Sequence, residues 1–194
     1  LRGLSQIFTF MRTSPTPVYF VSPTPYNILG IDQWVGAFEY ISYFDAFDGH
    51  HPHVFVPRHE GMPDFSSFEA VNTYLLAHKD VADRVRARGG GKALFVMFEE
   101  ETEVLAAELG LEIALPPREL REHIDSKIRT TEIANEAGIA SAPNILARAA
   151  GYKELLALAG KAKLGTDLVV QTPYGDSGRT TFFIRDEAGW RKNE

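Results

Sequence analysis

Residues 168–184 read Leu168-Val169-Val170-Gln171-Thr172-Pro173-Tyr174-Gly175-Asp176-Ser177-Gly178-Arg179-Thr180-Thr181-Phe182-Phe183-Ile184. Two apolar runs, rich in β-branched and aromatic residues, flank a short segment of Pro, Gly, Asp and Ser, which predicts a β-hairpin with a wide turn. Glycine lets the backbone approach a ligand closely, and exposed N–H groups in such a turn receive phosphate oxygens well. Taken alone, the segment is equally well explained as an ordinary hairpin, because short motifs often match by chance.

The composition is that of an ordinary globular chain. Of the 194 residues, 44% are hydrophobic and 24% are charged, enough for one large domain or two small ones with a buried core. The net charge of -6 argues against general nucleic-acid binding, since phosphate contacts need a basic face. The absence of cysteine excludes disulfides and thiolate metal sites and fits a reducing, cytoplasmic compartment. No apolar run approaches the length of a membrane span, so we expect no membrane partner.

Residues 15–117 alternate strand-like and helix-like segments. Compact apolar runs predict strands at residues 18–21, 40–44, 54–56, 93–98 and 111–115. Apolar residues at helical spacing predict a short helix over residues 31–38, a long one over residues 66–89 and a third over residues 102–109. This alternation predicts a parallel sheet with helices on both faces. Residues 1–17, in contrast, look irregular, and Pro15 and Pro17 keep their end out of a helix.

The clearest helical signal lies in residues 66–89. Ser66 with Glu69 forms a capping-box pattern at the start, and Gly89 stands where a left-handed residue closes a helix. Steps of three and four place one stripe of residues toward the core. The stripe consists of Phe68, Val71, Leu75, His78, Ala82 and Val85. We therefore predict one helix, with His78 as a core residue on its buried face.

The character of the chain changes after Pro116 and Pro117. A helix is predicted over residues 127–137, capped by Asp125 or Ser126 and closed by Gly138. An extended piece over residues 144–147, a helix over residues 155–162, the hairpin and a charged tail follow. Because these elements are too few to bury a core by themselves, we expect an unfinished second domain. The predicted domains are residues 1–120 and residues 121–194.

Four segments of the sequence together are similar to the ATP-grasp superfamily, and among its branches to biotin carboxylase and its carboxylate–amine ligase relatives. They are residues 110–116 (GLEIALP), 125–127 (DSK), 135–143 (NEAGIASAP) and 169–178 (VVQTPYGDSG). Their order and spacing resemble the family across residues 93–184, which is more specific than the hairpin alone. The resemblance implies a Rossmann-like pre-ATP-grasp domain with a parallel sheet, followed by an incomplete α+β ATP-grasp subdomain.

The resemblance also implies an ATP-dependent ligase that activates a carboxylate or bicarbonate as an acyl phosphate, which an amine or similar nucleophile then attacks. ATP would be held by Lys127 and by the turn of the hairpin, and Glu99 and Glu100 would lie near the substrate. The residues of the turn and its preceding strand that this assigns to ATP are Gln171, Tyr174, Gly175, Ser177, Gly178 and Arg179. Mg²⁺ is expected with the nucleotide, because phosphoryl transfer depends on positioning and charge neutralisation.

The metal ligands and catalytic residues of the family come from its second half, so these 194 residues alone are not expected to turn over substrate. No metal ligand is therefore assigned in this sequence. Members of the biotin carboxylase branch often dimerise, and a homodimer is one assembly that the resemblance implies.

Two alternative functions stay open. The family usually has lysine at the position of Gln171, so a nucleotide-binding or scaffold protein without catalysis is the first alternative. A Rossmann oxidoreductase is the second alternative. Against it, residues 22–25 (SPTP) replace the glycine fingerprint that follows the first strand of dinucleotide-binding domains.

Three further motifs have simpler explanations. Gly91-Lys92 lacks the spacing of a P-loop, and a helix end followed by a tight turn explains residues 89–92 better. The histidines of residues 50–59 are expected in a solvated loop, because metal sites need a defined ligand geometry. Glu99, Glu100 and Glu101 are equally well explained as favourable charge at a helix N-terminus.

Overall fold

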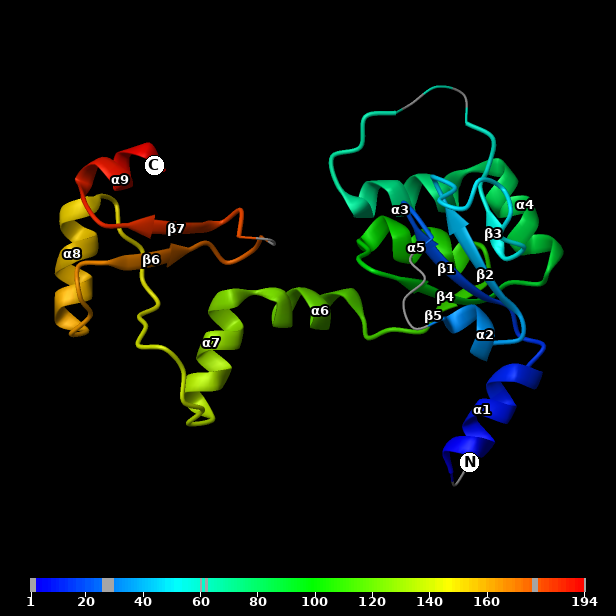
Figure 1. Cartoon of the computed structure of the whole chain (residues 1–194), viewed down its shortest axis with the longest axis horizontal. Coiled ribbons are helices and arrows are strands. Elements are labelled where there is room, and N and C mark those ends of the chain that lie inside the picture. Colours follow the sequence, from blue (N-terminus) through cyan, green and yellow to red (C-terminus); the bar gives the residue numbers. More distant parts are fainter. Residues whose placement is uncertain (1–2, 26–29, 60, 62, 176–177, 194) are drawn as a thin grey trace. The chain divides into compact units, whose positions relative to one another are not determined.

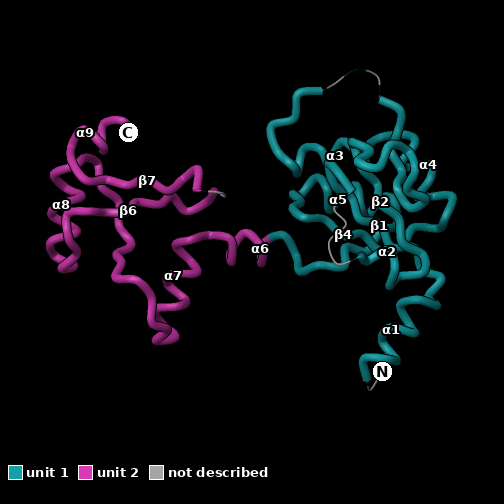
Figure 2. Tube along the Cα trace, in the orientation of Figure 1, with its two compact units in different colours: residues 1–118 teal, residues 119–194 magenta. Residues whose placement is uncertain are grey.

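The computed structural model describes residues 3–25, 30–59, 61, 63–175 and 178–193. The chain divides into two compact units, residues 1–118 and residues 119–194, which Figure 2 shows in two colours. None of the helices in these described residues has the length and apolar character that crossing a bilayer requires.

Unit 1 is built on a parallel sheet flanked by helices (Figure 1). Its strands are β1 (Val18–Ser22), β2 (Phe38–Ser42), β3 (Val54–Phe55), β4 (Gly91–Phe95) and β5 (Leu111–Ile113). The order is β3-β2-β1-β4-β5, and every neighbouring pair is parallel. The predicted α/β class is confirmed, and this arrangement is consistent with a Rossmann-like fold. The strand bounds differ from those predicted by up to three residues, as is usual where an apolar run continues beyond the ladder.

Side chains of the strands alternate between two apolar cores, one on each face of the sheet. Tyr19 and Val21 of β1 face the larger core, which helices α3 (Phe68–Ala77), α4 (Lys79–Ala87) and α5 (Glu100–Glu108) complete. Phe20 faces the smaller core, against which residues of α1 (Leu4–Thr13) and α2 (Ile31–Trp34) pack. Both faces of the central strands are therefore buried, which explains why these strands read as continuous apolar runs.

The helix predicted over residues 66–89 is two helices, because the chain bends at His78. The backbone of His78 is extended there, with φ -68° and ψ 131°, and its side-chain Nδ1 accepts a hydrogen bond from the N–H of Asp80 at 3.1 Å. His78 is therefore the N-cap of α4 and not a core residue. The first cap is also shifted by one residue, since Ser67 and not Ser66 accepts from the N–H of Ala70.

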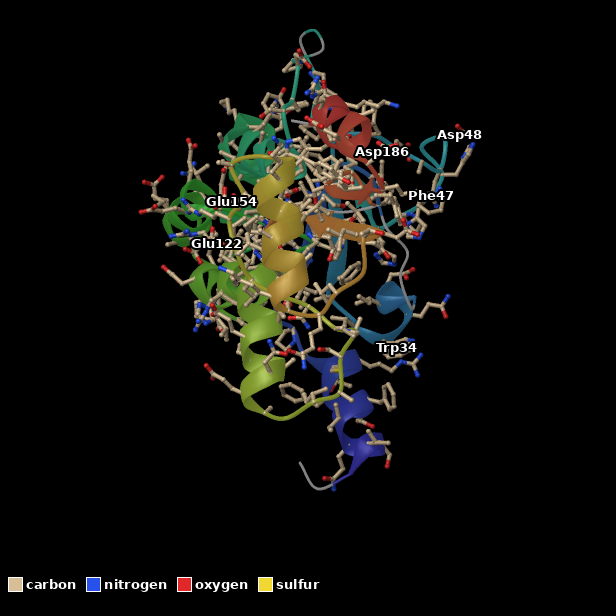
Figure 3. All side chains as sticks on the ribbon, turned by 90° about the vertical axis from the view of Figure 1, so that its left-hand side faces the viewer. Trp34, Phe47, Asp48, Glu122, Glu154 and Asp186 are labelled. Carbon is tan, nitrogen blue, oxygen red and sulfur yellow. The ribbon has the colours of Figure 1, made fainter. Side chains whose placement is uncertain are left out.

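The N-terminal segment also differs from the prediction. Residues predicted to be irregular form α1, whose Met11 packs on the smaller core and whose Phe8 meets the ring of Trp34 edge-on at 5.4 Å. Trp34 ends the short helix α2, where Figure 3 labels it. Phe38, predicted to be in that helix, instead begins β2. The stripe that places α1 on unit 1 was present in the sequence, but the two following prolines obscured it.

Unit 2 contains four helices and a two-stranded antiparallel sheet among its described residues. The helices are α6 (Arg118–Asp125), α7 (Lys127–Glu136), α8 (Tyr152–Lys161) and α9 (Glu187–Lys192), with α6 starting at the boundary. Strands β6 (Leu168–Gln171) and β7 (Thr181–Ile184) form the predicted hairpin, with Leu168 paired to Ile184 and Gln171 to Thr181. Residues 144–147, predicted to be extended, form no strand, and the predicted charged tail contains α9.

The core of unit 2 is small. Ala159, Leu168 and Ile184 are its buried apolar residues, with Trp190 and others packed around them. Carboxylates accept backbone hydrogen bonds at the starts of α8 and α9, and Figure 3 labels the two residues, Glu154 and Asp186. The carboxylate of Glu154 accepts from the N–H of Ala150 at 2.8 Å, ahead of α8. Asp186 accepts from the N–H of Gly189 at 2.7 Å and so begins α9.

Candidate functional site

The start of α7 positions the lysine that the sequence assigns to phosphate. Ser126 is buried, and its hydroxyl accepts from the N–H of Arg129 at 3.4 Å, so of the two predicted caps, Asp125 and Ser126, the structure has Ser126. Lys127 is then the first residue of the helix. Since a helix N-terminus carries partial positive charge, the backbone and the side chain of Lys127 together make this end of α7 favourable for an anion.

The turn between β6 and β7 lies directly against Lys127. The backbone N–H of Lys127 donates to the carbonyl of Pro173 at 2.8 Å, and its Nζ donates to the carbonyl of Gly175 at 2.5 Å. Residues separated by 48 positions in the sequence therefore meet within unit 2. The lysine points toward the turn, as a joint phosphate site requires.

Hydrogen bonds inside the turn give it a defined shape. The N–H of Thr172 donates to the carbonyl of Thr180 at 3.2 Å and extends the ladder of the hairpin by one bond. The hydroxyl of Thr172 donates to the carbonyl of Tyr174 at 2.8 Å. Gly175 has φ +123°, and a Cβ there would lie 2.4 Å from the side chain of Thr180, so only glycine fits.

The other turn residues assigned to ATP are placed in different ways. Gln171 donates from Nε2 to the hydroxyl of its cross-strand partner Thr181 at 3.0 Å. Tyr174 is 54% exposed, and Arg179 is also exposed. Gly178 accepts at its carbonyl from the N–H of Thr181 at 3.1 Å. Ser177 lies outside the described residues.

Glu99 and Glu100 belong to unit 1, where both have local structural partners. Glu99 is the N-cap of α5, its N–H donates to the hydroxyl of Thr102 at 3.3 Å, and its carboxylate accepts from Thr73 at 3.2 Å. The carboxylate of Glu100 lies 3.8 Å from the guanidinium of Arg118, with 81% of its side chain exposed. These contacts support the helix-capping interpretation of the two residues, and their assignment to a substrate remains a proposal.

Among the histidines of residues 50–59, His51, His53 and His59 are half-buried, so the prediction of a solvated loop is wrong for these three, whereas His50 is exposed. His51 Nε2 lies 3.5 Å from a carboxylate oxygen of Asp32, and His59 Nε2 lies 2.8 Å from the carbonyl of Tyr43. Burial, and then the charge of Asp32, raise the pKa of Tyr40, whose ring adjoins that of His51. In the part of the chain that the structure describes, no three His, Cys, Asp or Glu side chains are grouped to hold a metal ion.

Several buried polar side chains that were not predicted as site residues lie where β1, β2 and β4 end. Ser22 and Ser42 are register partners at the ends of β1 and β2, and both are fully buried. Asn72 of α3 is also fully buried and donates to the carbonyl of Met97 at 2.6 Å. Within the described residues, the hydroxyl of Ser42 and the Oδ1 of Asn72 have no hydrogen-bond partner. Ser22 and Ser42, which end the strands β1 and β2, were the available signal in the sequence.

Comparisons with known proteins add no relative. No family model matches the chain, and no curated protein matches it at a significant level. The function is therefore argued from the motif order and from the geometry of Lys127 and the turn.

Proposed function

We propose that unit 2 binds the phosphates of ATP between Lys127 and the turn of the β6–β7 hairpin. On this proposal the chain is the N-terminal part of an ATP-grasp ligase that activates a carboxylate or bicarbonate as an acyl phosphate. The observation that carries the proposal is the placement of Lys127 Nζ at the carbonyl of Gly175, 48 residues away in sequence. A positive charge at a helix start and a glycine-containing turn are both chemically suited to phosphate oxygens.

Additional charge for the phosphates would come from Arg179, which is exposed two residues before β7. Gln171 would contribute the second N–H of its amide, since one N–H of Nε2 already donates to Thr181. Mg²⁺ usually keeps several water ligands and binds through phosphates plus one or two carboxylates. Because no group of three ligating side chains exists in the described residues, we propose that Mg²⁺ reaches unit 2 on the triphosphate.

Replacing Lys127 with methionine is expected to weaken ATP·Mg binding at least tenfold. The substitution keeps the length and apolar stem of the side chain but removes a charge-assisted contact worth about 1.5–3 kcal/mol, which corresponds to roughly ten- to hundredfold in the dissociation constant. Isothermal titration calorimetry with ATP·Mg would measure it. Lys153, an exposed lysine on α8, is the matched control, and Lys153→Met should leave the dissociation constant within twofold. Equal binding by the two variants would remove Lys127 from the site.

A nucleotide-binding protein without catalysis is the second candidate, and the side chain of Gln171 favours it. An amide held by a cross-strand hydrogen bond brings no positive charge to the phosphates. The two candidates differ in ADP release by the full-length gene product. A ligase releases ADP faster when bicarbonate or the correct small carboxylate is added, and hydroxylamine traps its acyl phosphate as a hydroxamate. A binding protein without catalysis shows neither response, although it retains nucleotide.

A further inference from the structure

The groups of unit 2 best suited to phosphate are occupied by the protein's own backbone. The Nζ of Lys127 donates to the carbonyl of Gly175, and the N–H of Lys127 donates to the carbonyl of Pro173. One further N–H in the first turn of α7, that of Arg129, donates to the hydroxyl of Ser126. Among its described residues, the turn therefore presents the carbonyl oxygens of Pro173 and Gly175 to the start of α7.

Carbonyl oxygens at this position disfavour a bound phosphate. The carbonyl oxygens of Pro173 and Gly175 both carry partial negative charge. A phosphate oxygen bound at Lys127 would lie close to them, and no hydrogen bond could offset the repulsion, because both partners are acceptors. An ammonium has three donors, so Lys127 could hold phosphate while keeping one backbone contact, but the two carbonyls would still repel the anion. Phosphate binding therefore requires the peptides of Pro173 and Gly175 to turn away from α7.

Further hydrogen bonds support the contacts of Pro173 and Gly175 with Lys127. The hydroxyl of Thr172 fixes the carbonyl of Tyr174, directly before Gly175. The N–H of Thr172 and the carbonyl of Thr180 close the turn at its base. The positive φ of Gly175 completes the geometry that aims its carbonyl at Lys127. Reorienting Gly175 requires these contacts to loosen.

We propose that the contact of Lys127 with Pro173 and Gly175 is an autoinhibitory latch. The latch holds the turn on the start of α7, and a triphosphate binds only after the two carbonyls have moved away from Lys127. The holding role depends only on contacts within the protein. The inhibitory role rests on the proposed binding of ATP, so the two roles are tested separately.

Hydrogen exchange without nucleotide tests the holding role. The probes are the backbone N–H groups of Thr172 and Thr181, which donate to Thr180 and Gly178 in and beside the turn. In Lys127→Met these two amides should exchange at least fivefold faster than in the wild type, whereas Lys153→Met should leave them unchanged. Amides of α8 serve as the internal reference in each sample. Unchanged exchange in Lys127→Met would overturn the latch, whatever the protein binds.

Thr172→Val tests the inhibitory role, because it loosens the turn while Lys127 keeps its charge. The substitution is nearly isosteric at an exposed position and removes the hydroxyl that donates to Tyr174. Stopped-flow measurements with a fluorescent ATP analogue should show association at least threefold faster than in the wild type. Thr172→Val should therefore make nucleotide binding faster, whereas Lys127→Met should make nucleotide binding weaker. Slower or unchanged association would overturn the inhibitory role.

The two failures are distinguishable. If no variant binds the analogue but Lys127→Met exchanges faster, the proposed function and the inhibitory role are both wrong, and Lys127 only fastens the turn. If the analogue binds and Thr172→Val associates no faster, the proposed function stands and the latch does not inhibit binding.

Discussion

Replacing Glu39 with alanine is expected to destabilise unit 1 by about 3 kcal/mol. Glu39 lies on β2 and is only 5% exposed. Its carboxylate accepts from Arg84 at 2.5 and 2.8 Å, in a two-pronged contact, and from Arg88 at 3.2 Å. These bonds join α4 to the centre of the sheet, and the hydrogen bond from Arg84 to Glu39 raises the pKa of Arg84.

The size of this destabilisation depends on how well water can solvate the guanidinium groups of Arg84 and Arg88 once Glu39 is removed. Breaking a buried ion pair typically costs about 3–5 kcal/mol, because the remaining charge is left without a partner. Here the side chains of Arg84 and Arg88 are 42% and 33% exposed, so both can turn toward water, and the lower end applies. Arg84 also lies over the ring of Phe55 at 4.5 Å, and it would give up this cation–π contact on turning toward water, which keeps the cost from falling further.

Urea denaturation can measure this change in unit 1 alone, because each unit contains one tryptophan, Trp34 in unit 1 and Trp190 in unit 2. In a Trp190→Phe background the fluorescence of Trp34 reports unit 1, and the urea midpoint should fall by about 1 M or more. Glu112→Ala is the control. Glu112 pairs with Lys92 at 2.7 Å on the same sheet but is 73% exposed, so its loss should cost less than about 1 kcal/mol. Equal costs for the two variants would contradict the buried role of Glu39.

The parallel sheet could be predicted from the sequence because its information is local. Most of the strands are short apolar runs that end at or shortly before a serine or a proline. A short run that is buried on both faces is typical of a strand in a parallel sheet. The break at His78 could not be predicted in this way. His78 lies at the correct spacing to continue the apolar stripe, and its Nε2 contacts the carbonyl of Arg58, 20 residues earlier. A contact between residues that far apart in sequence does not change the local spacing of apolar residues, so the helical pattern does not reveal it.

The candidate site shows the same division between local and distant information. The cap at Ser126 and the hairpin of residues 168–184 follow from local residue types and were predicted with nearly correct bounds. The contact of Lys127 with the turn was expected only through the family resemblance. The residue types at the start of α7 and in the hairpin do not by themselves indicate that the two segments meet. The orientation of the peptides at Pro173 and Gly175 was not predictable at all. Peptide orientation depends on backbone hydrogen bonds that any residue type could make.

Replacing Gly90 with alanine is expected to destabilise unit 1 by about 2–5 kcal/mol. Gly90 has φ +79°, a left-handed conformation that costs an L-residue about 1–2 kcal/mol. A Cβ at Gly90 would also lie 2.2 Å from the carbonyl oxygen of Gly110, which is backbone and cannot swing aside. Since that carbonyl accepts from the N–H of Gly91, displacing it would separate the starts of β4 and β5. Overpacking of this kind adds about 1–3 kcal/mol.

Gly89→Ala separates the two causes, because Gly89 has nearly the same φ of +80° but no atom within 4 Å of the position of a Cβ. Its cost should therefore be the conformational part alone, about 1–2 kcal/mol. Urea denaturation of both variants, followed by Trp34, should show Gly90→Ala as the less stable by 1 kcal/mol or more. Equal stability would mean that the β4–β5 contact yields to a methyl group. A larger loss at Gly90 would show that residues 89–91 are glycine because a helix end must pass beside a neighbouring strand, a structural reason that requires no phosphate at this turn.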